Sequence, residues 1–294
     1  MSPTLLYSGK VRDVYRVDPD HLLLVASDRL SAFDVVMNET VPDKGRVLTG
    51  VTDFWARRVA PEVESALVSC DPAVITPLVD EFPPAWAGRA CLAREAEMVP
   101  LECIVRGRLA GQAYEEYRRR GTVHGEAVPE GLRLGDAFDE PRFTPSTKSA
   151  EGHDVNISNE EAAQLVGDET LARCREMCLT IFRLAADHLA ERGLVLADTK
   201  FEVGWVDGRL VVCDEVVTPD SSRLWAANDL EPGRTPPSFD KQPFRDWLDE
   251  SGWDRTPPPP TIPPGVVSET AERYRRAYEL VTGGSLEDWY GGGE

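Results

Sequence analysis

The chain has 294 residues, of which 41% are hydrophobic and 28% charged, so it can bury one large core or two modest ones. Acidic residues outnumber Lys and Arg by 51 to 32, and the resulting net charge of −19 repels phosphate backbones and anionic lipid. We therefore expect neither nucleic acid nor a membrane as a partner, although small anionic substrates remain possible where basic residues cluster. No segment resembles a signal peptide or approaches the about 20 apolar residues of a membrane span, which favours a cytoplasmic protein.

The first 100 residues are predicted to be mainly antiparallel β-structure with a helix or two. The segment LLYSGKVRDVYRV is typical of strand, turn and strand, and HLLLVASD of a further strand. DFWARRVAPEVESAL favours a helix that is interrupted at Pro61. Apolar runs of strand length lie on both sides of Pro100 in RACLAREAEMVPLECIVRG.

The clearest helix is in TLARCREMCLTIFRLAADHLAERG, where Gly193 is a natural C-cap. Its apolar residues have the spacing of one helix face: Leu171, Cys174, Cys178, Ile181, Phe182, Ala185 and Leu189. The following segment predicts a β-hairpin, because Asp207-Gly208 stands between two apolar strands. EPGRTPPSFDKQPF and RTPPPPTIPPG are expected to be extended surface segments, followed by a helix near 268–282 and a Gly-rich tail.

The cysteines and histidines form no recognisable metal motif. There is no C-x-x-C pair, and although Cys174 and Cys178 are one helical turn apart, no cluster of His or Cys accompanies them. Among the histidines, only His153 lies in chemically dense surroundings. We expect all six thiols to be buried, reduced and inert: Cys70, Cys91, Cys103, Cys174, Cys178 and Cys213.

The segment YSGKVRDVY combines a flexible turn with positive charge. Gly9 would let the backbone approach a phosphate, and Lys10 and Arg12 supply charge beside it. The segment is not a Walker motif, and an ordinary hairpin with exposed basic residues remains the alternative.

A second basic segment, PLECIVRGRLAGQ, places Arg106 and Arg108 between an apolar strand and the small-residue turn Ala110-Gly111. Guanidinium groups at a strand end suit a phosphate or a carboxylate. The alternative is a pair of surface arginines that match Glu115 and Glu116.

Two polar segments further along the chain carry groups that commonly contact ligands. PRFTPSTKSAEGHDVNIS is long and poor in apolar residues, as functional loops often are; alternatively it is a solvated loop whose end caps the next helix. In TPDSSRLW, Arg223 stands beside an apolar Leu-Trp anchor and is well placed for a phosphate.

The hairpin itself carries an unusual stripe of charge. Asp198, Lys200 and Glu202 alternate with apolar residues in VLADTKFEVG, so they share one strand face. A two-residue turn would place Glu215 opposite Lys200, whereas a three-residue bulged turn would place Asp214 opposite Glu202, and both registers stay open.

Converging carboxylates repel one another unless a cation lies among them. With only oxygen ligands that cation would be Mg²⁺ or Mn²⁺. A salt-bridged exposed face is the alternative, but Phe201 and Val203 make the hairpin a core element. Basic phosphate-binding groups, a carboxylate cluster and no plausible covalent nucleophile together favour a nucleotide-dependent transferase or ligase.

Several long motifs, taken together over roughly residues 7 to 247, resemble the SAICAR synthetase family of purine biosynthesis. They are YSGKVRDVY, SDRLSAFDVV, KGRVLT…FW, EMVPLECIVRG, FTPSTKSAEGHDVNIS, LADTKFEVG and DEVVTPDSSRLW. The resemblance implies an α+β fold, with an N-terminal antiparallel β domain over 1–98, a larger α+β domain over 99–294, and ATP in the cleft between them. It also implies an ATP-dependent ligation of L-aspartate to carboxyaminoimidazole ribotide through an acyl phosphate.

By position, the resemblance assigns Gly9, Lys10 and Arg12 to the glycine loop over the ATP phosphates. The backbone at Met98 would meet adenine. Lys148 would reach the reacting phosphates.

The same comparison implies that Asp198 and Lys200 face the imidazole. Mg²⁺ would be held by Glu202 and Asp214 with Asp154 near it, which favours the register that pairs Asp214 with Glu202. The implied ribotide-binding residues are Arg106, Gln112, Ser222 and Arg223.

Two departures from the family pattern fall near the ribotide or aspartate pocket. Gln112 replaces the Ser that ends R-x-x-x-[TA]-G-S, and Val155 replaces an acid in HDEN. They keep open a paralogue that acts on a related heteroaryl carboxylate. A non-catalytic nucleotide-binding protein is a further alternative. Oligomeric state, substrate order and the contacts of aspartate are not predicted.

Overall fold

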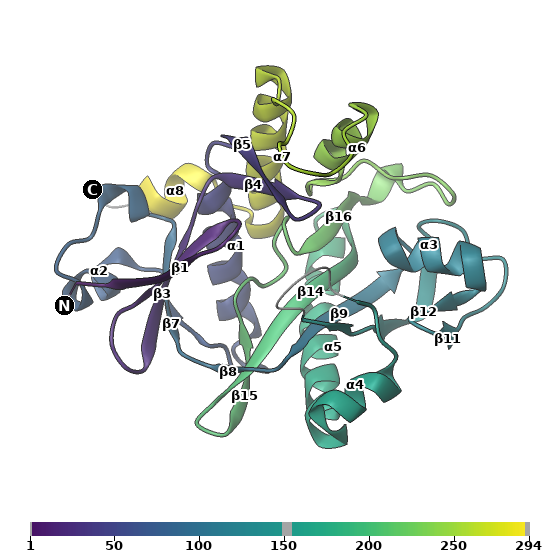
Figure 1. Cartoon of the computed structure of the whole chain (residues 1–294), viewed down its shortest axis with the longest axis horizontal. Helices are drawn as coiled ribbons and strands as arrows, with labels where there is room; N and C mark the ends of the chain where they lie inside the picture. The colour runs from purple at the N-terminus through teal and green to yellow at the C-terminus, as the bar shows by residue number, and fades with distance from the viewer. Residues whose placement is uncertain (1, 149–154, 292–294) are drawn as a thin grey trace.

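The computed structural model describes residues 2–148 and 155–291, and it contains two main antiparallel sheets with helices packed around them (Figure 1). This arrangement confirms the α+β class predicted from the sequence. In Figure 1 the N-terminal strands lie on the left, and the long strand β14 crosses the centre of the molecule beside β9.

The N-terminal sheet contains the strands predicted for the first 100 residues. Its strand order is β1-β2-β3-β7-β6, formed by Thr4–Ser8, Arg12–Arg16, His21–Ala26, Ala90–Arg94 and Leu67–Ser69. Leu23 and Leu92 pack in a small core with Ile75 of the short helix α2 (Pro72–Ile75). Strands β4 (Arg29–Ala32) and β5 (Val35–Thr40) pair separately.

The second sheet is organised around β14 (Leu194–Val206). Because β14 pairs with strands on both of its edges and at both of its ends, it brings distant segments to one surface. Its direct partners are β8 (Glu97–Met98), β9 (Leu101–Arg108), β15 (Arg209–Cys213) and β16 (Ser222–Ala226). Strands β12 (Ala137–Phe143) and β13 (Ser146–Thr147) pair with β9, and β10 (Thr122–Val123) pairs with β11 (Glu126–Ala127).

Helix α5 (Asp168–Ala190) confirms the strongest helix prediction, since all seven apolar positions of the predicted face are buried in the main core. The helix ends before Gly193, and Glu191 takes the C-cap position that was predicted for that glycine. Helix α1 (Lys44–Val59) stops just before Pro61, as expected, but the predicted continuation after Pro61 is wrong, because that segment leads into strand β6. The other helices are α3 (Gly111–Arg120), α4 (Asn159–Val166), α6 (Gln242–Glu250), α7 (Pro264–Thr282) and α8 (Leu286–Gly291).

The hairpin between β14 and β15 corrects one expectation. Val206 pairs with Arg209 around a two-residue turn, whose Asp207 and Gly208 both have positive φ, so Glu202 lies opposite Cys213. The register that the family resemblance favoured, with Asp214 opposite Glu202, is therefore wrong. Strand β15 ends at Cys213, and Asp214 leaves the ladder with a φ of 55°.

The main core joins both halves of the chain. Trp55 of α1 packs in the same cluster as Leu101 of β9 and Phe201 of β14. The division into domains at 98 and 99 therefore stays a prediction, because α1 buries its apolar face in the core of the second sheet. None of the helices in the described ranges is long and apolar enough to cross a membrane.

Candidate active site

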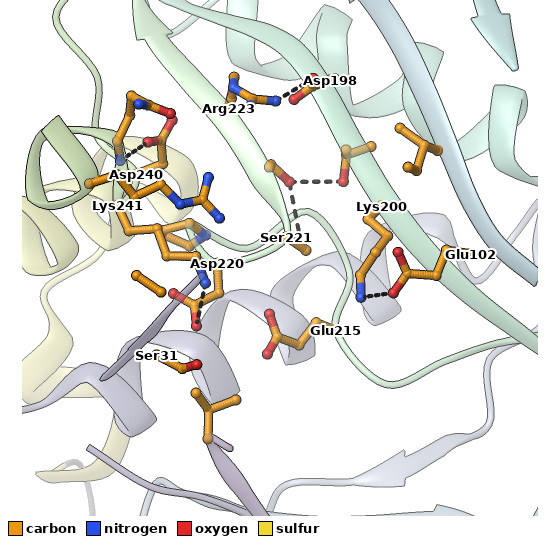
Figure 2. Close-up of a pocket in the computed structure, with 18 of the residues that line it drawn as sticks. Ser31, Glu102, Asp198, Lys200, Glu215, Asp220, Ser221, Arg223, Asp240 and Lys241 are labelled. Carbon is orange, nitrogen blue, oxygen red and sulfur yellow. Dashed lines mark hydrogen bonds and ion pairs between the residues drawn. The ribbon is translucent and has the colours of Figure 1, made fainter. Parts of the chain in front are cut away.

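A cleft of about 860 Å³ lies over the charged stripe of β14. Its walls come from β14, from β9, from the segment after β15, from the start of α6 and from residues 31–34. Figure 2 shows Lys200 and Glu102 on one side of this cleft, with Asp220, Asp240 and Lys241 on the other.

The stripe occupies the floor of the cleft, as predicted. Asp198, Lys200 and Glu202 all line it. Lys200 Nζ lies 2.6 Å from Glu102 Oε1 and 3.7 Å from Glu202 Oε1, and Lys148 Nζ lies 2.5 Å from Glu202 Oε2. The alternative of a solvent-exposed salt-bridged face is thus wrong for Asp198, which is buried.

Two lysines stabilise the charged form of Glu202. Burial by itself would raise the pKa of Glu202, but the charges of Lys148 and Lys200 hold it below its ordinary value. Burial likewise opposes the charge on Lys200, and Glu102 and Glu202 raise the pKa of that lysine. Sequence reasoning did not select Glu102, whose only signal is an acid between the buried Leu101 and Cys103 of a core strand.

At one end of the stripe, two further acids face an arginine. Arg12 contacts Asp214, and its Nη2 lies 3.1 Å from Glu215 Oε1. Both acids line the main cleft. In the parts of the chain that the structure describes, no group of three or more His, Cys, Asp or Glu side chains is arranged to hold a metal ion. The predicted ligand Asp154 lies outside those parts.

At the opposite end, one buried carboxylate holds two arginines. Asp198 Oδ2 lies 2.7 Å from Arg106 Nη1 and 2.6 Å from Arg223 Nη1. Arg106 is 3% exposed and also donates through Nε to Thr144 Oγ1 at 3.1 Å. The surface-arginine alternative is therefore wrong for Arg106, whereas Arg108 donates to the Gly135 carbonyl and does not line the cleft.

The N-terminus of α3 faces the same arginines. Gly111 has a φ of +54°, and a Cβ added there would lie 2.4 Å from Arg223 Nη2, so this close approach requires glycine. The N-cap residue Ala110 supplies no side-chain acceptor, which leaves the first N–H groups of the helix available to an anion. Gln112 follows in the first turn and lines the cleft, and Ser222 Oγ donates to Thr199 Oγ1 at 2.8 Å.

The start of α6 adds cations that were not predicted. Lys241 and Arg245 line the cleft, although Lys241 belongs to EPGRTPPSFDKQPF, which was expected to be an extended surface segment. That expectation is wrong for Ser238 and Asp240, which are buried against β16, and for Phe244, which is buried in α6. Burial and neighbouring cations lower the pKa of both Lys241 and Arg245, so an anion in the cleft would favour their charged forms.

This inner wall has an excess of positive charge, although the whole chain is strongly acidic. Four cations that line the cleft lie among three carboxylates with buried side chains, so cations outnumber carboxylates on this wall. The cations are Arg106, Arg223, Lys241 and Arg245, and the carboxylates are Asp198, Asp220 and Asp240. Lys44 and Tyr274 both bind Asp220, which fixes the segment that leads to Arg223.

Two of the four residues predicted to bind ATP line a hollow, each a different one. Lys10 lines the main cleft and pairs with Asp34, and Arg12 lines a smaller hollow of about 20 Å³ together with Asp214. Gly9 N donates to Arg12 O within the β1–β2 turn. Met98 pairs with Gly204 at the edge of β14, and neither Gly9 nor Met98 lines either hollow.

A family model described as SAICAR synthetase matches residues 5–260. The chain belongs to this family. It is 50% identical to the phosphoribosylaminoimidazole-succinocarboxamide synthase of Saccharopolyspora erythraea, over 96% of this chain and 95% of that relative. It is 47% identical to the enzyme of the same name from Syntrophobacter fumaroxidans, over 96% and 94% of the two chains.

Solved structures of the family share the fold. The SAICAR synthase of Saccharomyces cerevisiae, complexed with SAICAR, has a TM-score of 0.88 and 38% identity, with 96% of each chain covered. A type-2 SAICAR synthetase in complex with ADP has a TM-score of 0.71 at 24% identity, over 95% of this chain and 98% of that one. Because the identity to this second structure is only 24%, the similarity shows a shared fold and nothing more.

As a member of the SAICAR synthetase family, the chain is an ATP-dependent ligase that joins L-aspartate to carboxyaminoimidazole ribotide in purine biosynthesis. The comparisons do not support the paralogue alternative. Of the two departures from the family pattern, Gln112 lines the cleft, whereas Val155 is exposed and bonds with Thr147.

Proposed function

We propose that the inner wall binds the phosphate of the ribotide and that the stripe binds its carboxylate and the phosphates of ATP. The single observation that carries this assignment is Asp198, which holds Arg106 and Arg223 together at the N-terminus of α3. Two guanidinium groups and a helix N-terminus form a strong binding site for a phosphate monoester.

The charge balance of the wall supports the same ligand. A phosphate monoester carries about −1.5 to −2 charges at pH 7. On this wall cations outnumber carboxylates, and within the described residues the buried Nε of Arg245 has no hydrogen-bond partner. Within this proposal, Arg245, Gln112 and Ser222 help to hold the ribotide.

At the other end, the acids and lysines suit phosphoryl transfer. Glu202 and Asp214 offer the carboxylate oxygens that Mg²⁺ prefers, and they would hold the ion with Asp154 near it. The bound ion would neutralise the ATP phosphates. Lys148 and Lys200 would move from Glu202 toward the transferred phosphoryl group, where their charges stabilise the transition state.

The reaction then follows from the substrates. A carboxylate oxygen of the ribotide attacks the γ-phosphorus of ATP, and the bond from that phosphorus to the β-phosphate oxygen breaks. ADP is released, and the ribotide becomes an acyl phosphate. The amino group of L-aspartate attacks the acyl carbon, inorganic phosphate leaves, and the nitrogen loses a proton. Asp198 keeps the two arginines in position and faces the imidazole beside Lys200.

The nucleotide assignment concerns the turn between β1 and β2 and strand β8. Gly9, Lys10 and Arg12 would cover the ATP phosphates, and the backbone at Met98 would meet adenine. Arg12 contacts Asp214, one of the acids assigned to the metal end, and Lys10 lines the same cleft, which is consistent with this placement. A cytoplasmic location belongs to the same proposal.

The test is release of ADP by the purified chain with Mg²⁺, ATP, L-aspartate and carboxyaminoimidazole ribotide, each omitted in turn. We expect release to need all four and to run at about 1 to 10³ per second. Release that continues without the ribotide or without L-aspartate would contradict the proposal.

A further inference from the structure

Two thiols lie against each other at the N-terminal sheet, Cys91 within β7 and Cys70 directly after β6. Cys70 Sγ and Cys91 Sγ are 2.7 Å apart, and both side chains are buried. This separation is shorter than the about 3.5–4.0 Å contact between two carbon atoms, although sulfur is the larger atom. It is within about 0.7 Å of a covalent S–S bond of about 2.05 Å.

The backbone places the two residues opposite each other. Strands β6 and β7 are antiparallel, with Leu67 opposite Ala93 and Ser69 opposite Leu92. Cys70 follows directly after the end of β6, where continuing the same register brings it opposite Cys91. Opposed residues of antiparallel strands have Cα atoms about 4.5–5.5 Å apart, which lies within the range that a disulfide bridges. A bond between these thiols therefore needs no backbone rearrangement.

We propose that Cys70 and Cys91 are a modification site, at which a small peroxide oxidises the two thiols to an intramolecular disulfide. Cys91 is the thiol that an oxidant can reach, because it lines the smaller hollow with Arg12, Leu24 and Asp214. That hollow, of about 20 Å³, has room for one molecule of the size of water or hydrogen peroxide.

The chemistry needs only hydrogen peroxide as the oxidant. The sulfur of Cys91 attacks one peroxide oxygen, the O–O bond breaks, and a sulfenic acid and one water form. The sulfur of Cys70 then attacks the sulfenyl sulfur, the S–O bond breaks, and a second water leaves. Two thiols lose two electrons and two protons, and one peroxide becomes two waters.

The environments of the two thiols give them different roles. The adjacent Cys91 thiol and burial raise the pKa of Cys70 well above its ordinary value. Of the two thiols, only Cys91 lines the hollow, so it meets the peroxide first and Cys70 acts as the second, resolving sulfur.

The other thiols of the chain offer a matched comparison. Cys103 lies with Cys174 and Cys178 in the main core between β9 and α5, and none of these three lines either hollow. These three thiols test whether proximity alone is sufficient for oxidation by peroxide, because they are close together but enclosed in the core.

The experiment treats the full chain with hydrogen peroxide, counts thiols after denaturation, and maps peptides without reductant. We expect the count to fall from six to four and one cross-linked peptide pair to contain Cys70 and Cys91. Dithiothreitol should restore all six thiols. The oxidised chain should melt about 4 °C or more above the reduced chain, because the bond closes the loop over residues 70–91.

Variants separate this pair from the enclosed cluster. Cys91→Ala should lose no thiol pair to peroxide, whereas Cys103→Ala, which removes the central member of the other cluster, should still lose two. The proposal is overturned if the wild-type chain keeps six thiols, or if the cross-linked peptides contain other cysteines. Turnover of the reduced chain tests the proposed function separately, so either idea can fail alone.

Discussion

At the scale of single residues, the site depends on buried charges that neutralise one another. Asp198 alone would be a costly buried carboxylate, and Arg106 alone a costly buried guanidinium. Together with Arg223 they form a preorganised group whose excess charge is positive. A substrate phosphate completes this group without requiring it to rearrange.

Arg223→Ala should therefore weaken binding of the ribotide much more than binding of ATP. Loss of one charge-assisted hydrogen bond costs about 1.5–3 kcal/mol, which corresponds to roughly a 10- to 100-fold rise in the ribotide KM. Steady-state kinetics, with the concentration of each substrate varied in turn, would measure the KM values for the ribotide and for ATP. Arg108→Ala is the control, because Arg108 bonds to a carbonyl outside the cleft. A rise confined to the KM of ATP would contradict the assignment.

Glu202→Gln should abolish Mg²⁺-dependent turnover and leave the fold intact. The amide keeps the shape of the side chain but loses the charge that Lys148 and Lys200 surround. We expect kcat to fall by about 100-fold or more, measured as ADP release over a Mg²⁺ titration. Glu160→Gln, an exposed change in α4, should keep normal turnover. Near-normal activity of Glu202→Gln would show that the metal assignment is wrong.

His124 makes the fold sensitive to acid. Burial, together with the charge of Arg106, lowers the pKa of His124 to about 4. The unfolded chain binds this proton near pH 6.5, so the free energy of unfolding decreases as the pH falls from 6.5 toward 4. The contribution of this one group between pH 7 and pH 5 is about 2 kcal/mol.

His124→Asn should remove that part of the acid sensitivity. Asn tolerates the φ of 50° at this turn position and does not titrate. Urea denaturation at pH 7 and pH 5 would measure the difference in the free energy of unfolding. If wild type and variant lost the same stability between these two pH values, His124 would not be the responsible group.

At the scale of elements, α3 is placed by the glycines at its two ends. Both Gly111 and Gly121 have positive φ, but only Gly111 faces another side chain, the guanidinium group of Arg223. Backbone strain and contact with the site can therefore be separated within one helix.

Gly111→Ala and Gly121→Ala should each destabilise the chain by about 1 kcal/mol through the strained φ. Only Gly111→Ala should also raise the KM of the ribotide, since its methyl group would displace Arg223. Thermal melting and steady-state kinetics of the two variants would measure both effects. An equal KM in both would mean that the position of Arg223 does not depend on Gly111.

At the scale of the whole molecule, the cleft exists because β14 pairs with β8 and β9 from a distant part of the chain as well as with the nearby β15 and β16. Its stripe contacts Glu102 from β9 and Arg223 from β16, and Lys241 at the start of α6 lines the same cleft. The acidic surface and the positive inner wall thus coexist in one chain of net charge −19. An anionic substrate is therefore attracted to the cations of the cleft, although the rest of the surface repels it.

The sequence by itself determined the features that depend on neighbours in the chain. Periodicity was sufficient to predict the buried face of α5 and the shared face of Asp198, Lys200 and Glu202. The pair Asp207-Gly208 was sufficient to predict the turn. Each of these features is set within a few residues of the chain. Long motifs in order were sufficient for the family.

Only the tertiary structure decided which distant groups meet. It brought together groups from segments that are separated in the chain: the double ion pair of Asp198, the cations at the start of α6, and the contact between Cys70 and Cys91. Their positions follow from strand order and from the burial of charge against charge. No local pattern encodes either of these, because both depend on contacts that form when the chain folds.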